Sequence, residues 1–239
     1  MGADDMNYNI RGFVEVSFLD WVGAVCSIMF LPNCNFRCPY CHNANLVLHP
    51  ETVPRIAEAE VFPRLRKQKK WIEGVVVTGG EPTLSPTLPD LLRSLHRYGL
   101  KVKLDSNGSR PEVLSRLIKE GLVDYSVMDV KSRLEQSKMD AVCGIKAPLE
   151  AIKESIEIMK SCGLPHQFRT TFCPKFVTFD DLDQIGEEIR GADVWTVQNF
   201  KNQNTLDASL SEVEPIDGEE LLALRPRLEH FVKRLQIIP

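Results

Sequence analysis

Short strand-like runs alternate with longer helix-like stretches along most of this chain. The runs are rich in β-branched residues, and the stretches between them place apolar residues three or four positions apart. Strands are predicted at 24–31, 74–78, 100–104, 123–128, 166–172 and 193–198, with an extra strand at 11–17. Parallel strands need crossover connections, usually helices, so these units predict a parallel sheet with right-handed crossovers. Six units are too few for a closed eight-stranded barrel, so the expected fold class is α/β, a partial (β/α)6 barrel of the TIM type.

The helical stretches carry apolar stripes that identify the face turned to the core. Stripes at 149–163, 111–121 and 182–191 are each closed by a glycine, which is a common helix stop. From about residue 217 a further stripe of leucines predicts a last amphipathic helix that runs to about 236.

Length and composition favour a single domain. A chain of 239 residues that is 43% apolar can bury one large core. No Ser/Gly-rich linker or low-complexity tract divides the sequence. One domain over residues 1–239 is therefore expected, with a core of about 12–200.

Charge and apolar content argue against two classes of partner. The formal net charge of −4 disfavours a general nucleic-acid binder, and the longest apolar run, around 24–31, is too short to span a bilayer. Seven cysteines, an odd number, and a polar N-terminus favour a reducing cytoplasm over secretion with disulfides. The basic cluster at 64–70 suits the end of a predicted helix, and its further role stays open.

Three cysteines in the run C-N-F-R-C-P-Y-C point to a metal cluster. Cys34, Cys38 and Cys41 supply three thiolates within eight residues. A structural zinc site takes four ligands, and ferredoxin [4Fe–4S] sites use four cysteines. No fourth cysteine stands at ligand spacing, so one metal would lack a protein ligand and stay open for chemistry. The remaining cysteines have no pair spacing and are expected to be small buried residues: Cys26, Cys143, Cys162 and Cys173.

Polar and glycine-rich segments follow the predicted strands. Active sites of parallel α/β sheets gather at the C-terminal ends of strands. The cysteine loop follows the first strand, and T-G-G-E-P at 78–82 follows the second, where glycines let backbone approach a ligand closely. Later strands end in charges that could bind a zwitterionic small molecule or its carboxylate. The residues at these later ends are Asp105, Ser106, Asn107, Asp129, Lys131, Arg169, Gln198 and Asn199.

Together these motifs resemble the radical S-adenosylmethionine superfamily. Cys34 to Cys41 followed by Gly79 to Pro82 carries the resemblance, which covers about 12–198. The segments F-L-D-W-V-G, C-P-Y-C-H-N, V-V-V-T-G-G-E-P-T-L, K-L-D-S-N-G and V-D-Y-S-V-M-D-V-K are similar to anaerobic ribonucleoside-triphosphate reductase activating proteins and to pyruvate formate-lyase activating enzymes. Two departures stand out: Val22 replaces a usual proline, and Lys201 appears where a histidine often contacts the cofactor.

The resemblance implies a [4Fe–4S] cluster on Cys34, Cys38 and Cys41, with S-adenosylmethionine on the fourth iron. It also implies a monovalent cation held by Asp105, Ser106 and Met128. The resemblance further implies a set of residues that bind S-adenosylmethionine at its methionine amino end, adenine, ribose and carboxylate. They are Gly79, Gly80, Glu81, Pro82, Tyr40, Ser106, Asn107, Asp129, Lys131 and Arg169.

The implied activity is reductive cleavage of S-adenosylmethionine to a 5′-deoxyadenosyl radical, with flavodoxin or ferredoxin as electron donor. The expected substrate is a glycine of a partner, such as anaerobic ribonucleotide reductase, which would become a glycyl radical enzyme. Few polar side chains remain beyond those assigned to the cofactor, which favours a protein substrate. The alternative is modification of a small molecule or peptide, as by a deazaguanine-type synthase or a maturase. A non-catalytic electron carrier or iron sensor would instead need four protein ligands and no glycine turn.

We expect anaerobically reconstituted protein to bind about four irons per chain. Replacing Cys34, Cys38 or Cys41 by Ala should abolish the cluster, because each thiolate holds one iron. Iron analysis and the visible absorption spectrum measure this, with Cys162→Ala as the control that retains iron. A full cluster in all three variants would contradict the assignment.

Overall fold

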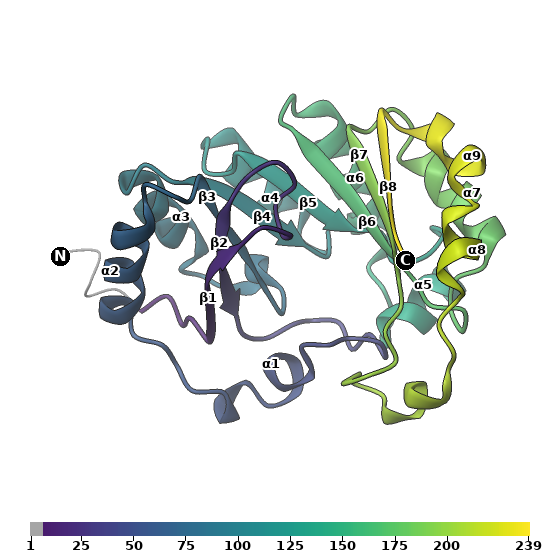
Figure 1. Ribbon diagram of the computed structural model, residues 1–239, viewed down its shortest axis with the longest axis horizontal. Helices are drawn as coiled ribbons and strands as arrows, with labels where there is room; N and C mark the ends of the chain where they lie inside the picture. The colour runs from purple at the N-terminus through teal and green to yellow at the C-terminus, as the bar shows by residue number, and fades with distance from the viewer. Residues whose placement is uncertain (1–6) are drawn as a thin grey trace. The chain divides into compact units, whose positions relative to one another are not determined.

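Eight β-strands follow one another in chain order in one sheet of the computed structural model, which describes residues 7–239 (Figure 1). Their bounds are β1 Gly12–Ser17, β2 Cys26–Leu31, β3 Gly74–Gly79, β4 Lys101–Ser106, β5 Tyr125–Asp129, β6 His166–Phe172, β7 Val194–Asn199 and β8 Arg234–Ile238. β1 runs antiparallel to β2, whereas the pairs β2–β3, β3–β4, β6–β7 and β7–β8 are parallel. The α/β class and the mostly parallel sheet are confirmed, and the order is linear, from β1 to β8.

The chain divides into two compact units. Unit 1 contains residues 7–35, 45–106 and 112–126, and unit 2 contains 36–44, 107–111 and 127–239. No helix within residues 7–239 is both long enough and apolar enough to cross a membrane.

Unit 1 holds strands β1 to β4 with the helices α2 (Glu58–Gln68) and α3 (Leu88–Arg97), and most of α1 (Ala44–Leu48) and of α4 (Pro111–Lys119) (Figure 1). Its core is aliphatic because the central strands are apolar on both faces, as parallel strands covered by helices are. Val75 and Val77 of β3 and Leu104 of β4 are fully buried, as are Leu91 and Leu95 of α3.

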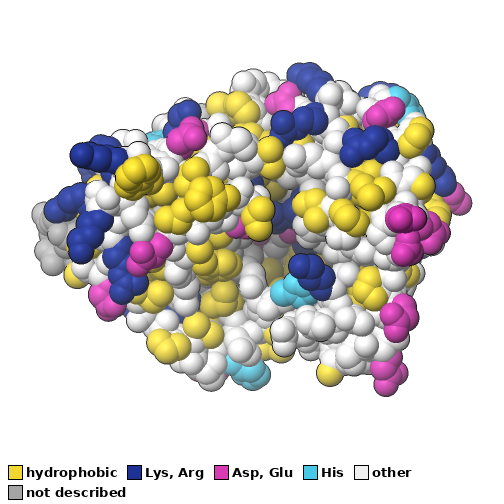
Figure 2. Space-filling model, viewed as in Figure 1, with side chains coloured by type: hydrophobic (Ala, Val, Ile, Leu, Met, Phe, Trp, Pro, Cys, Tyr) yellow, Lys and Arg dark blue, Asp and Glu magenta, His cyan; other side chains and the backbone are white. Residues whose placement is uncertain are grey.

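The β1–β2 hairpin leaves large apolar side chains in solvent. Phe18 and Leu19, between the two strands, are 74% and 88% exposed. Val14, Val16 and Val22 are also exposed, and apolar side chains gather over this hairpin on the face seen in Figure 2. Contiguous exposed apolar surface of this kind marks interaction sites more often than it occurs by accident.

Unit 2 holds β6 to β8 with the helices α5 (Gln136–Cys143), α6 (Leu149–Ser161), α7 (Phe179–Glu188), α8 (Gly218–Leu222) and α9 (Arg225–Leu228). Its strands are in register, so side chains alternate between two faces of the sheet. Phe168, Trp195 and Leu235 are aligned on one face and are buried. The opposite face carries the polar residues between them.

The C-terminal prediction was wrong in part. Instead of one helix from about 217 to 236, the chain forms α8, α9, a 3-10 turn and the strand β8. Pro226 lacks a backbone N–H and stands in the first turn of α9, so it begins a new helix rather than continuing α8. After it, the alternately buried Leu235 and Ile237 belong to β8, which pairs with β7. The leucine stripe indicated a helix here, so this strand was not predicted.

Gly186 of α7 allows a close ring contact within unit 2. A Cβ at this position would lie 2.4 Å from the ring of Phe231. Alanine is normally better than glycine in a helix interior by about 1 kcal/mol, but overpacking a filled site costs about 1–3 kcal/mol. We expect Gly186→Ala to lower the free energy of unfolding by about 1–2 kcal/mol, measured by urea denaturation.

The control is Glu188→Ala on the exposed side of the same helix, which should change stability by less than about 0.5 kcal/mol. A more stable Gly186→Ala protein would contradict the packing argument.

Candidate functional site

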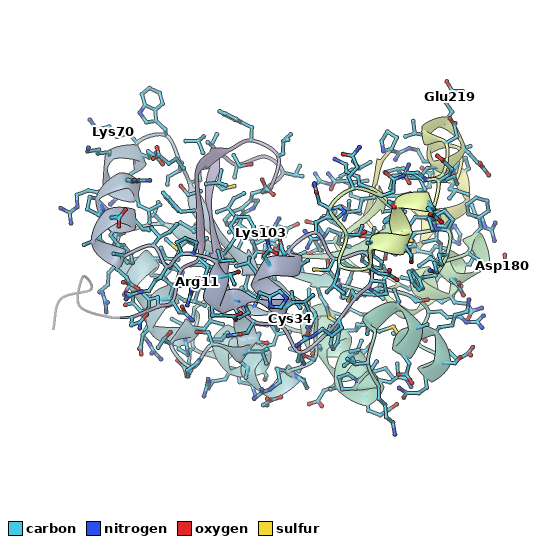
Figure 3. The ribbon with its side chains drawn as sticks, turned by 90° about the horizontal axis from the view of Figure 1, so that it is seen from below. Arg11, Cys34, Lys70, Lys103, Asp180 and Glu219 are labelled. Atoms are coloured by element: carbon cyan, nitrogen blue, oxygen red, sulfur yellow. The ribbon has the colours of Figure 1, made fainter. Side chains whose placement is uncertain are left out.

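The cysteine segment, residues 34–41, leaves the end of β2 and passes from unit 1 into unit 2. Within residues 7–239 none of these three cysteines is in a disulfide; Cys38 is buried, whereas Cys34 and Cys41 are half-buried. The Cys41 backbone N–H donates to the Cys38 carbonyl oxygen over 3.0 Å, which closes a turn between these two residues. Cys34 lies inside unit 1, away from Lys70 at its margin (Figure 3).

The donor set fits an iron–sulfur cluster better than a single ion. Within residues 7–239, no three His, Cys, Asp or Glu side chains converge as ligands of one metal ion. Zinc would need such convergence, whereas the thiolates of a [4Fe–4S] cluster bind different irons and stand apart. Three unbridged thiols in one short segment therefore suit the cluster.

Two glycines bring the turn after β3 against the start of the cysteine segment. The Gly80 N–H donates to Leu31 O over 2.9 Å, and the Glu81 N–H donates to Asn33 O over 2.7 Å. A Cβ at Gly80 would lie 1.9 Å from Asn33 O, and one at Gly79, whose φ is 124°, would lie 2.2 Å from Leu31 O. Both glycines are thus required by the protein's own backbone contact. Their expected contact with a cofactor stays a prediction.

The Glu81 carboxylate connects this turn to the end of β4. Its Oε1 accepts from the Thr83 N–H over 3.0 Å and from the Ser106 hydroxyl over 3.0 Å. Glu81 is 1% exposed and Pro82 is also buried, so the turn is held rigidly. Asp105, the neighbour of Ser106 on β4, is buried as well.

Two other predicted residues lie in unit 2 with local roles. Asn107 is buried and its Oδ1 accepts from the Ser109 N–H over 2.9 Å, forming a turn after β4. Met128 is fully buried in β5, and its side chain lies where a Cβ on Gly108 would be. The cation site predicted for Asp105, Ser106 and Met128 stays a prediction.

Three charged residues in unit 2 form one ion-pair network. Arg169 Nε donates to Asp129 Oδ1 over 2.7 Å, and Lys131 Nζ donates to Asp129 Oδ2 over 3.2 Å. Burial by itself would raise the pKa of Asp129, but the Arg169 and Lys131 cations hold it below its usual value. Burial would likewise lower the pKa of Lys131, and the Asp129 carboxylate outweighs this and raises it well above its usual value. Asp129 is thus paired with an arginine and a lysine, side chains of the kind that also bind carboxylates.

Tyr40 forms an aromatic wall beside this network. Its buried ring lies 6.0 Å from Lys131 Nζ and 6.3 Å from the ring of Phe176. Burial raises the pKa of its hydroxyl well above the usual value, so the tyrosine stays neutral. The predicted residues Tyr40, Asp129, Lys131 and Arg169 are therefore brought together in unit 2.

Sequence reasoning missed Cys143, which the fold brings next to the cysteine segment: its carbonyl oxygen accepts from the Arg37 N–H over 2.8 Å. The Cys143 thiol lowers the pKa of Cys38 to about 7, and the Cys38 thiol raises the pKa of Cys143. In Cys41, burial raises the pKa. The two sulfurs of the pair meet through tertiary structure, so no ligand spacing in the sequence could indicate the contact.

Sequence reasoning also missed a polar row on β6 to β8, on the sheet face that carries Arg169. Gln167 Nε2 donates to Thr196 Oγ1 over 2.7 Å, and Thr196 Oγ1 donates to Gln236 Oε1 over 2.8 Å. The expectation that few polar side chains remain beside the cofactor residues was therefore wrong. The alternation of polar and apolar residues in H-Q-F-R-T-T-F could have indicated that Gln167 lies on the same sheet face as Arg169.

In unit 1, Lys103 of β4 was missed as well, although it is only 4% exposed. Its Nζ lies 5.6 Å from the ring of Tyr125 and donates to the Asp20 carbonyl oxygen. In Figure 3 it points into unit 1, unlike Lys70.

The residues whose roles stayed open have ordinary contacts. Lys201 is exposed, and its carbonyl oxygen lies 3.0 Å from His42 Nε2. In the basic cluster, Arg64 pairs with Glu15 at 3.6 Å on the surface. Gln198 donates to Thr171 Oγ1 over 2.9 Å, and Asn199 donates to a backbone carbonyl.

Comparison with known proteins identifies the family to which the chain is similar. A family model described as the Radical SAM superfamily matches residues 28–189. A protein of Methanocaldococcus jannaschii named "Putative glycyl-radical enzyme activating enzyme" is 30% identical, and the match covers 95% of each chain. A protein of Sulfurisphaera tokodaii named "Probable GTP 3′,8-cyclase" is 31% identical over 84% of this chain and 66% of that protein.

Among solved structures, Streptococcus suis SuiB has a similar fold. Bound to precursor peptide SuiA, it has a TM-score of 0.66 at 16% identity, covering 87% of this chain and 47% of SuiB. Bound to S-adenosylmethionine, it has a TM-score of 0.63 at 14% identity, covering 89% of this chain and 52% of SuiB. This chain thus spans about half of that larger enzyme.

Arg169→Ala and Asp129→Ala should each weaken the binding of S-adenosylmethionine by about 1–3 kcal/mol, the range for losing a charge-assisted hydrogen bond. That is roughly a 5- to 150-fold rise in Kd, measurable by anaerobic isothermal titration calorimetry on cluster-loaded protein. The matched control is Arg190→Ala, because Arg190 pairs with Glu187 on the surface of unit 2. Unchanged affinity in both site variants would show that the network serves another purpose.

Proposed function

The chain belongs to the radical SAM superfamily, whose cofactors are a [4Fe–4S] cluster and S-adenosylmethionine, and we propose that its substrate is a glycine of a partner enzyme. Bound together, these cofactors supply a 5′-deoxyadenosyl radical, which would remove one Cα hydrogen from that glycine. The observation that carries the proposal is the match with the M. jannaschii protein, which extends over 95% of both chains. A match of that extent supports a shared type of substrate.

The chain's own residues are proposed to bind and orient the cofactors. Cys34, Cys38 and Cys41 hold the cluster, and Gly79 to Pro82, with Ser106 and Asn107, contact the methionine part of S-adenosylmethionine. Asp129, Lys131 and Arg169 bind its ribose and carboxylate, and Tyr40 covers its adenine. The pairing of Arg169 and Lys131 with Asp129 and the buried aromatic ring support these roles. Asp105, Ser106 and Met128 are proposed for a monovalent cation, and flavodoxin or ferredoxin is proposed as electron donor.

An exposed apolar hairpin supports a protein substrate. Phe18 and Leu19, at 74% and 88% exposure, present side chains that a protein partner could cover. A partner that must insert a glycine loop needs a place to dock, and exposed apolar surface is typical of such places.

A second candidate is modification of a small molecule or peptide, favoured by the polar row of Gln167, Thr196 and Gln236. These amides and the hydroxyl are uncharged hydrogen-bonding groups on the face of Arg169. The cyclase name of the S. tokodaii relative agrees with this candidate.

The test mixes reduced, cluster-loaded protein and S-adenosylmethionine with the glycyl radical enzyme encoded in the same genome. We expect an electron paramagnetic resonance doublet, because the remaining Cα hydrogen splits the signal of the glycyl radical. Deuteration of the partner glycine at Cα should collapse the doublet. The control replaces that glycine of the partner by alanine and should give no signal.

Three results would reject the activating role. They are a genome without any glycyl radical enzyme, a partner that never yields the doublet, and deuterium transfer to 5′-deoxyadenosine from GTP instead of glycine. The last would establish the second candidate.

A further inference from the structure

Three large apolar side chains of unit 1 stand out in solvent. Leu19, Trp71 and Phe18 are 88%, 76% and 74% exposed, whereas the next large apolar side chain within residues 7–239, Ile238, is 52% exposed. Single exposed apolar side chains are ordinary, but several of them on one area of surface mark an interaction site. The backbone around Trp71 shows that these three share one area.

The turn after α2 places Trp71 beside the β1–β2 hairpin. The Trp71 N–H donates to the Gln68 carbonyl oxygen over 2.7 Å, and the Gln68 side chain donates to Glu15 Oε2 on β1 over 2.7 Å. Two residues after Trp71, the Glu73 N–H donates to the Val25 carbonyl oxygen over 2.8 Å, where the hairpin returns to β2. Trp71 is thus connected to the hairpin on both sides and extends its apolar surface.

A basic cluster lies beside this apolar surface. Residues 64–73 contain five basic side chains, all exposed, and one acidic one, Glu73. Arg64 pairs with Glu15 at 3.6 Å, which places the cluster next to β1. In Figure 2, Lys and Arg side chains gather over α2 beside the apolar ones over the hairpin, and Figure 3 shows Lys70 at the margin of unit 1. The basic cluster consists of Arg64, Arg66, Lys67, Lys69 and Lys70.

The helix end explains only part of this composition. Arg66 and Lys67, in the last turn of α2, compensate the negative end of the helix dipole. Lys70 and Trp71 come after α2 has ended, and an exposed tryptophan gains nothing from the dipole. An aromatic and apolar centre with a charged rim is instead typical of protein–protein interfaces.

We propose that the hairpin, Trp71 and the basic cluster form one docking surface, and that its occupant is an acidic surface with an apolar centre on the partner enzyme that carries the substrate glycine. This inference rests on the proposed function. Apolar side chains of the partner cover Phe18, Leu19 and Trp71 and remove them from water, and its carboxylates meet the basic cluster. Complementary charges of this kind speed the encounter and fix its orientation.

An anionic membrane is the other surface that attracts lysine beside tryptophan. The formal net charge of −4 argues against it, because a membrane faces a large part of the molecule and repels its acidic remainder. A protein contact of standard size covers only about 800 Å² of each partner, so the local charge governs it. The basic cluster on an acidic chain therefore favours an acidic protein.

The test measures association and dissociation rates of the cluster-loaded full chain with the glycyl radical enzyme of the same genome, by biolayer interferometry at several salt concentrations. Lys67→Glu combined with Lys70→Glu should slow association about tenfold at low salt, because it removes electrostatic steering. The difference should vanish near 1 M salt, where the Debye length is about 3 Å. Trp71→Ser should instead speed dissociation about tenfold or more, as the loss of an aromatic anchor does.

The matched control combines Lys153→Glu with Lys233→Glu, which makes the same change in net charge on the surface of unit 2. Its association rate should stay close to that of the unaltered protein, because the change lies outside the docking surface. Without the partner, every variant should cleave S-adenosylmethionine as the unaltered protein does, since none of these residues is placed at the cofactor.

Equal association rates in the two double variants would overturn the proposal, as would an unchanged dissociation rate in Trp71→Ser. So would binding to vesicles of phosphatidylserine and phosphatidylcholine that the Trp71 and double lysine variants lose, since that identifies a membrane surface. Failure of the proposed function gives a different result: the partner binds with the expected rates but never yields the glycyl radical doublet. A doublet that forms equally fast in all variants at limiting partner rejects the docking surface and retains the activating role.

Discussion

The backbone contact between the glycine turn and the chain leaving β2 is the constraint on which unit 1's part of the site depends. The N–H groups of Gly80 and Glu81 donate to the carbonyl oxygens of Leu31 and Asn33, respectively. The two backbones lie so close that a Cβ would fit on neither Gly79 nor Gly80. The turn therefore cannot move without the start of the cysteine segment. Glu81 extends this coupling to Ser106 on β4, so three strand ends share one rigid set of hydrogen bonds. A site assembled in this way is largely formed before any ligand arrives.

In unit 2 the corresponding constraint is electrostatic, an ion-pair network. Asp129 is half-buried, and its desolvation is offset by two cations, Arg169 and Lys131. Removing either cation would leave a poorly compensated carboxylate, so the three charges are kept together by their mutual stabilisation.

Much of the fold followed from the sequence because parallel strands and amphipathic helices have strong local periodicity. The strand predicted at 166–172 coincides with β6, and the other predicted strands differ from the observed ones by a few residues at their ends. β8 was not predicted, because its short alternation of apolar and polar residues overlaps the leucine stripe that indicated a helix. Pro226, which stands in the first turn of α9, was the signal that a new helix begins there. The clustering of Tyr40, Asp129, Lys131 and Arg169 was predictable because they occur at a shared edge. The contact of Cys143 with the cysteine segment was not predictable, because tertiary packing creates it. The row of Gln167, Thr196 and Gln236 was not predictable either, because it depends on the register of the strands.

That division explains why the superfamily is easier to recognise than the substrate. The residues proposed to hold cluster and cofactor lie in short contiguous motifs, which a single sequence displays directly. The residues proposed for the substrate are scattered: Gln167 and Gln236 meet through strand register, and Phe18 and Leu19 lie in a hairpin. Relatives with activating-enzyme and cyclase names align with this chain at 30% and 31% identity, which fits a shared cofactor core. The exposed hairpin and the buried polar row therefore favour different substrates: the hairpin favours a protein partner, and the amides favour a small polar molecule or peptide.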